Sequence, residues 1–183
     1  MKRLVLFALL IALTGSNALI AQESGVQWMS FTEAVEAQKR TPRPVLIDFY
    51  TVWCGPCKML EKNTFQNPII AEYINKHFYA VKFNAEGKDS IAFNGAVFAN
   101  AAYDPARASG RNSPHDLTRA MAAVQGNIAY PTVVYLNANW EIITPVQGYY
   151  APKDIEPILH YVAEEAYLTQ PWEEYTQTFP SSF

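Results

Sequence analysis

The chain has 183 residues, of which 50% are hydrophobic and 14% are aromatic, and its formal net charge is -3 at pH 7. This composition predicts a packed globular protein and excludes a disordered chain. The small acidic charge gives no reason to expect nucleic acid or an anionic membrane surface as a partner.

The first residues have the pattern of a secretory signal peptide. Lys2 and Arg3 precede an apolar run over residues 4–13, and small residues suited to cleavage follow. The run is shorter than the roughly 20 residues of a membrane-spanning helix. We therefore predict a signal peptide over residues 1–21, a periplasmic or other extracytoplasmic location, and no stable membrane insertion after cleavage. An uncleaved N-terminal anchor is the alternative.

The first element after this leader is predicted to be a short helix. Ser30 and Glu33 form a capping-box pattern, which indicates a helix over about 31–39. The almost continuous apolar run over 45–50 then predicts a central strand that is covered on both faces. Asp48 is the lone acidic residue inside this run.

The order strand, helix, strand continues from there. Residues 58–62 extend a helix that begins near Cys54, so the thiols lie at the carboxyl end of the first strand. The pair Asn67-Pro68 has the pattern of a helix cap and first helical residue, which predicts a second helical piece near 68–76. Residues 78–83 return to strand character.

The segment 87–112 has a less regular pattern. Its apolar residues are spaced as on one side of a helix: Ile91, Val97, Phe98 and Ala101. It is therefore expected as a helical or loop insertion that caps the sheet. The alternative is a substrate or partner clamp built on Phe93, Phe98 and Tyr103.

In the last third of the chain the sequence predicts a helix, then a β-hairpin, and then a second, longer helix. The first helix is expected from a cap at Ser113-Pro114 to a stop at Gly126. Strands over 132–136 and 141–146 form a plausible antiparallel hairpin. A long amphipathic helix is expected over 152–168, and the tail over 170–183 has no predicted place.

The two cysteines, Cys54 and Cys57, are separated only by glycine and proline. A bridge between them closes almost no loop, so it can restrict the unfolded chain very little. Structural zinc usually takes four ligands, and the sequence has no second cysteine pair. The histidines His77, His115 and His160 are scattered and are expected as surface or half-buried residues. No metal site is therefore predicted.

Thiol chemistry needs a group that favours the thiolate. A helix N-terminus beside Cys54 supplies partial positive charge from unpaired amides and aligned peptide dipoles. Gly55 is expected to let the backbone turn tightly, and Pro56 suits the first helical turn, where a missing amide costs little. Cys57 then lies close to Cys54 on the same helix face.

The string from Trp53 to Lys58, which follows the strand ending at Tyr50, resembles thioredoxin. The resemblance implies an α/β thioredoxin fold with a central mixed sheet flanked by helices, here over residues 22–169. It also implies a thiol-disulfide oxidoreductase that acts on protein disulfides and needs no cofactor besides a redox-active Cys54-Cys57 disulfide.

More distant residues match the same family. Asp48 resembles the buried acid that takes and returns the proton of the second cysteine, and Lys82 resembles its partner lysine. Pro131 resembles the cis-proline that faces the active-site sulfurs, and Gly148 resembles a glycine of the substrate groove. The resemblance thus assigns Cys54, Cys57, Asp48 and Lys82 to catalysis. Substrate binding falls to Trp53, Gly55, Pro56, Tyr130, Pro131 and Gly148.

Three departures separate the chain from a minimal thioredoxin. The insertion at about 87–112 precedes the cis-proline strand, and Lys62 stands where the mid-helix proline is expected. Tyr130 replaces a small aliphatic residue, a change that concerns substrate preference. The string from Glu61 to Phe65 is similar instead to the C-terminal domain of membrane thiol:disulfide interchange reductases.

The Gly-Pro pair between the cysteines resembles the reducing end of the family, so we predict a reductase. In an oxidising compartment it needs an electron donor, for which a membrane reductase is the candidate. A disulfide oxidase or isomerase is one alternative. A thioredoxin-fold binding module with a vestigial dithiol is another, and a metal carrier with two thiolates is a third.

Overall fold

The computed structural model describes residues 25–183, so the predicted signal peptide lies outside the described residues. A mixed four-stranded sheet forms the centre of the molecule, with strand order β2-β1-β5-β6. Its members are β1 (Val45–Tyr50), β2 (Tyr79–Asn84), β5 (Thr132–Leu136) and β6 (Ile142–Gln147). Strand β1 runs parallel to β2 and antiparallel to β5, and β5 is antiparallel to β6. The predicted mixed sheet is confirmed.

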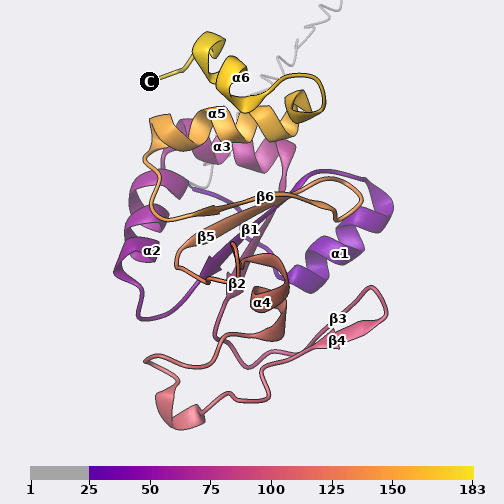
Figure 1. Ribbon diagram of the computed structural model, residues 1–183, viewed down its shortest axis with the longest axis vertical. Helices are drawn as coiled ribbons and strands as arrows, with labels where there is room; N and C mark the ends of the chain where they lie inside the picture. Colours follow the sequence, from indigo (N-terminus) through magenta and orange to yellow (C-terminus); the bar gives the residue numbers. More distant parts are fainter. Residues whose placement is uncertain (1–24) are drawn as a thin grey trace, which may run out of the picture.

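Helices cover both faces of this sheet (Figure 1). They are α1 (Phe31–Arg40), α2 (Gly55–Leu60), α3 (Pro68–His77), α4 (Asp116–Met121) and α5 (Pro152–Ala163). Because successive strand residues point to opposite faces, β1 feeds two separate cores. Ile47 packs in the core with α1 and α4, whereas Leu46 packs in the core with α3 and α5. This explains why the whole run of β1 is apolar except at Asp48.

Two helix starts follow directly from their capping residues. The Ser30 hydroxyl accepts the Glu33 amide at 3.2 Å, and the Ser30 amide donates to the Glu33 carboxylate at 2.8 Å. Asn67 Oδ1 accepts the Ile69 amide at 3.0 Å, with Pro68 as the first residue of α3. Each cap satisfies amides that a helix leaves unpaired at its start. Both predicted starts are confirmed.

The insertion begins with a β-hairpin and continues as loops, where a helical or loop insertion was expected. Strands β3 (Ile91–Phe93) and β4 (Ala96–Phe98) pair antiparallel, and a short 3-10 turn covers Pro105–Arg107. Asn94 and Gly95 have φ values of 49° and 76°, the left-handed pair that a two-residue hairpin turn requires. The expected helical spacing was therefore wrong.

The hairpin lies beside α1 (Figure 1), and its residues Ile91 and Phe93 belong to the core cluster on the α1 side of the sheet. The Phe93 ring lies 5.1 Å from Phe31 in α1 and 5.0 Å from Trp140, measured between ring centroids. Such edge-to-face contacts stabilise a packed cluster beyond the area they bury. The two strands β3 and β4 are thereby fixed to the main core.

Helix α4 begins later than predicted, because its cap is a histidine. His115 Nδ1 accepts the Leu117 amide at 3.0 Å, and Nε2 lies 2.7 Å from the Asp89 carbonyl, to which it donates. The side chain is fully buried, so the expectation of a surface or half-buried residue was wrong for His115. Helix α4 also ends at Met121, well before Gly126.

The C-terminal part also departs from the prediction. Helix α5 ends at Ala163, because Glu165 adopts a left-handed φ of 55°, and a 3-10 turn follows over Ala166–Leu168. The tail then forms helix α6 (Trp172–Thr178), which lies on α5 away from the sheet (Figure 1). No helix within residues 25–183 has the length and apolar character needed to cross a bilayer.

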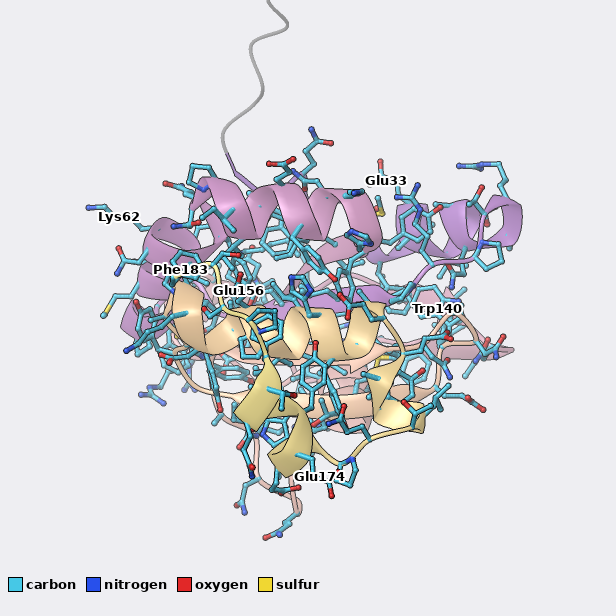
Figure 2. All side chains as sticks on the ribbon, turned by 90° about the horizontal axis from the view of Figure 1, so that it is seen from above. Glu33, Lys62, Trp140, Glu156, Glu174 and Phe183 are labelled. Carbon is cyan, nitrogen blue, oxygen red and sulfur yellow. A yellow bond between two sulfur atoms is a disulfide. The ribbon has the colours of Figure 1, made fainter. Side chains whose placement is uncertain are left out.

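The chain end is attached to the beginning of α5. Glu156 accepts hydrogen bonds from the Ser181 hydroxyl at 2.7 Å and from the Ser182 amide at 3.0 Å. Figure 2 shows Phe183 beside Glu156 when the molecule is viewed onto α5 and α6. The tail is therefore an integral layer of the structure.

Candidate redox site

The cysteine pair lies where β1 passes into α2. Cys54 is the cap residue of α2, and a disulfide joins it to Cys57, with their Cα atoms 5.3 Å apart. The Cys54 sulfur accepts the Cys57 amide at 3.1 Å. This amide is one of those that a helix start leaves without a backbone partner, so it is available to hold a sulfur anion.

Both cysteines of this turn are buried, and one expectation about the turn needs correction. Cys54 is 2% exposed and Cys57 is 4% exposed in the disulfide form. Gly55 has no left-handed φ, and a Cβ atom placed on it would meet nothing within 4 Å. The turn therefore does not require glycine at this position. Pro56 lies in the first turn of α2, as expected.

A buried acid and a lysine form the second part of the site. Asp48 in β1 and Lys82 in β2 are register partners across the parallel pair. Lys82 Nζ donates to Asp48 Oδ2 at 2.6 Å and also to Glu61 Oε2. The Glu61 amide in turn donates to the Cys57 carbonyl. This chain of contacts connects Asp48 with the helix that carries Cys57.

Burial dominates the electrostatics of this pair. Desolvation raises the pKa of Asp48 above its ordinary value, and the Lys82 ammonium offsets only part of that effect. Burial alone would lower the pKa of Lys82, but the carboxylates of Asp48 and Glu61 outweigh it and raise that pKa. Asp48 is therefore a carboxyl that can hold a proton under milder conditions than an exposed aspartate.

The lysine is also held by aromatic rings. Its Nζ lies 4.7 Å from the ring centroid of Trp28 and 5.2 Å from that of Tyr50. A cation over a ring face is attracted by the ring quadrupole, most strongly when water is partly excluded. These contacts fix the ammonium of Lys82 next to Asp48.

Four of the predicted groove residues are joined by direct contacts. The Tyr130-Pro131 peptide bond is cis, and the Gly148 amide donates to the Pro131 carbonyl at 2.8 Å. Gly148 has a φ of 103°, which strongly favours glycine. The Trp53 ring lies 5.8 Å from the Tyr130 ring. The structure thus brings together Trp53, Tyr130, Pro131 and Gly148.

Three charged residues near the site were not predicted. Glu61 lies one helical turn after Cys57, and this spacing could have indicated it. Glu86 accepts the Trp53 indole N–H at 2.8 Å, and the Arg111 guanidinium lies over the Trp53 ring. Glu86 follows the end of β2 beside the end of β1, whereas the position of Arg111 depends on the path of the insertion, which no local pattern encodes. Within residues 25–183 no group of three or more His, Cys, Asp or Glu side chains is placed to hold a metal ion.

The fold and the site together define an α/β protein that carries a disulfide where a central strand passes into a helix. Comparisons with known proteins agree with this description. The sequence profile of the thioredoxin-like domain matches residues 31–163. Thioredoxin H2-1 of Oryza sativa is 45% identical over 47 residues, covering 26% of this chain and 32% of that protein. The thiol:disulfide interchange protein DsbD of Vibrio vulnificus is 36% identical over 62 residues, covering 31% of this chain and 10% of DsbD.

A solved structure supports the fold. A thioredoxin-fold protein from Helicobacter pylori superposes with a TM-score of 0.53 at 18% identity, covering 74% of this chain and 79% of the other. The chain belongs to the thioredoxin-like domain family, because the family profile spans most of its length. The matched part of the chain spans 32% of the length of thioredoxin H2-1 and 10% of the length of DsbD. The sequence similarity to these two proteins is therefore local.

Proposed function

We propose that this protein is an exported thiol-disulfide oxidoreductase that reduces disulfides in other proteins. The observation that supports the activity most directly is the Cys54-Cys57 disulfide at the start of α2, with an amide donated to the Cys54 sulfur. Residues 1–21 would direct export to the periplasm or another extracytoplasmic space. The thioredoxin-like domain would cover residues 22–169.

The reaction begins with the reduced protein. The Cys54 thiolate attacks one sulfur of a substrate disulfide, whose S–S bond breaks while a Cys54–substrate bond forms. The departing substrate sulfur takes up a proton. Cys57 then loses its proton to Asp48 and attacks the Cys54 sulfur, which breaks the mixed disulfide and forms the Cys54-Cys57 bond. The second substrate sulfur leaves as a thiolate and takes up the proton that Asp48 accepted, so it is released as a thiol.

Two electrons thus pass from the dithiol to the substrate, so a donor must restore both thiols. We assign that step to a dithiol reductant, with a membrane reductase as the partner in the cell. Lys82 would control the proton affinity of Asp48 through their 2.6 Å contact. The substrate chain would bind along Trp53, Gly55, Pro56, Tyr130, Pro131 and Gly148.

Reduction of insulin disulfides with dithiothreitol as the donor tests the activity. The wild-type protein should accelerate the reaction, Cys54→Ser should abolish the acceleration, and Cys57→Ser should accumulate a mixed disulfide on Cys54. The substitution Ser30→Ala, far along the chain from the cysteines, controls for general loss of folding. Equal activity of wild type and Cys54→Ser would refute the proposal.

The direction of electron flow is tested by the reduction potential of the Cys54-Cys57 pair. A reductase should have a reduction potential of about -270 mV, as thioredoxin has, whereas the potential of a strong exported oxidant is about -120 mV. Equilibration of the protein with glutathione buffers measures this potential. A value close to that of the oxidants would reverse the proposed direction while leaving the exchange chemistry in place.

A further inference from the structure

The insertion is attached to the edge of the redox site through a buried carboxylate. Glu86 is 8% exposed, and its Oε2 atom accepts both the Trp53 indole N–H and the Asn112 amide at 2.8 Å. Because one oxygen accepts two hydrogen bonds, the two donors stabilise the ionised form of the Glu86 carboxylate. The end of the insertion is thereby fixed against the tryptophan that precedes Cys54.

Further hydrogen bonds make this attachment rigid. The Asn112 side chain accepts the Asp104 amide at 2.8 Å and donates to the Asp104 carbonyl at 2.9 Å. The Asn100 side chain donates to the Gly87 and Ser113 carbonyls, which joins the two ends of the segment. A residue placed next to Asn112 therefore has a defined position relative to Trp53.

Arg111 is that residue. Its Cζ atom lies 4.0 Å from the centroid of the Trp53 ring, although Arg111 itself is exposed. Among the described residues no carboxylate lies within ion-pair distance of Arg111. A guanidinium that stacks through its face keeps its N–H groups at the edge free for a carboxylate.

Two further exposed cations lie on α2 and α4. Lys58 is exposed and directly follows Cys57, and Arg119 is exposed on α4. Burial raises the pKa of Tyr130, the Glu86 charge raises it further, and Arg119 acts in the opposite direction. Arg119 is therefore close enough to influence the groove. The exposed charges named here are thus cationic, whereas the Glu86 carboxylate is buried.

We propose that Arg111 selects substrates by binding a carboxylate beside the disulfide that is exchanged at Cys54. The preferred substrates are accordingly polypeptides with Asp or Glu next to the reactive cysteine. This inference rests on the proposed exchange function and changes no chemical step in it. Arg111 determines which substrate is preferred, because it contacts the substrate chain and takes no part in the reaction of the sulfur atoms.

Single-turnover exchange with two peptides tests this inference. Both peptides carry the same intramolecular disulfide, flanked by Glu in one and by Gln in the other, and each is mixed with the fully reduced protein. Wild type should oxidise about fivefold faster with the Glu peptide at low ionic strength, as expected for electrostatic attraction in a charged cleft. The preference should largely disappear at about 1 M salt, where charges are screened within about 3 Å.

The variant Arg111→Gln should lose the preference, and Arg111→Glu should reverse it. Arg107→Gln is the matched control, because it removes the same charge from the same segment but pairs with Asp104. It should retain the wild-type preference. Unfolding in urea checks that all three variants fold.

The outcomes separate the two proposals. If wild type reacts with both peptides at equal rates, substrate selection by Arg111 is refuted and the exchange function stands. If neither peptide reacts, the exchange function itself is refuted. A preference that survives unchanged in Arg111→Gln would also overturn the assignment to Arg111.

Discussion

Lys82 Nζ lies 2.6 Å from Asp48 Oδ2, while the other oxygen of Asp48, Oδ1, is buried with no hydrogen-bond partner in the described structure. The two residues meet because β1 and β2 are parallel and place them in register. One oxygen of the carboxylate is thus neutralised and the other is desolvated. This asymmetry is costly for a fully ionised aspartate.

Replacing Asp48 with Asn should therefore stabilise the protein at neutral pH while slowing exchange. We expect the free energy of unfolding at pH 7 to rise, because desolvation of the Asp48 charge outweighs the attraction of Lys82, and Lys82 keeps Glu61 as an ion-pair partner in the variant. Burial raises the pKa of Asp48. Folding therefore favours its protonated form, and this stabilisation is complete below the unfolded pKa of about 3.9. It is lost as pH rises through the folded pKa.

Urea unfolding of wild type and Asp48→Asn across this pH range measures the effect. The two curves should converge at low pH and separate as pH rises. The exposed Asp89→Asn is the control and should show no such divergence. A lower stability of Asp48→Asn at pH 7 would show that the ion pair with Lys82 outweighs the burial of Asp48.

Substitutions of Lys82 and of its second partner Glu61 should shift the pH profile of exchange in opposite directions. Lys82→Gln removes the cation that lowers the pKa of Asp48, so the rate profile should move to higher pH. Glu61→Gln removes a negative charge that raises the pKa of Asp48, so the profile should move to lower pH. Single-turnover rates over a pH series measure both shifts.

The exposed Lys62→Gln is the control for the loss of a nearby positive charge, and its profile should match that of wild type. A purely structural role for Lys82 and Glu61 would change the rates without moving the profile. Parallel shifts in both variants would contradict the assignment of the titrating group to Asp48.

Much of the fold is encoded in short-range patterns. The capping box at Ser30, the Asn67-Pro68 start and the apolar run of β1 each depend on neighbouring residues, and each prediction was confirmed. The hairpin at Asn94-Gly95 also has a short-range signal, because this pair favours two left-handed residues in succession. The error there came from giving helical spacing more weight than the turn.

The remaining differences depend on tertiary contacts. His115 becomes a helix cap because the insertion brings the Asp89 carbonyl to its other ring nitrogen. Glu86 reaches Trp53 because β1 and β2 end side by side, whereas Arg111 reaches Trp53 only through the path of the insertion. The contact of Asp48 with Lys82 was expected from the family resemblance, whereas its geometric cause is the strand register.

Tyr135 offers a test of the core on the α5 side of the sheet. Its side chain is fully buried, and its hydroxyl has no hydrogen-bond partner in the described structure. Tyr135→Phe removes this unsatisfied group and should raise the free energy of unfolding by about 1 kcal/mol. Urea unfolding measures the change, with the exposed Tyr149→Phe as a neutral control. A loss of stability would show that the hydroxyl makes a hydrogen bond that protein atoms do not supply.

The docking of the C-terminal tail should depend on pH through Glu156. Burial alone would raise the pKa of Glu156, but hydrogen bonds from Ser182 and Ser181 outweigh it and lower that pKa. The stabilisation is therefore present above the unfolded pKa and is lost as pH falls through the folded one.

Glu156→Ala should lower the free energy of unfolding at pH 7 by about 1–3 kcal/mol, because charge-assisted hydrogen bonds are lost. Thermal unfolding at neutral and acidic pH measures this, and the difference from wild type should narrow in acid. The exposed Glu173→Ala is the control, and an equal effect of both substitutions would contradict a specific tail anchor at Glu156.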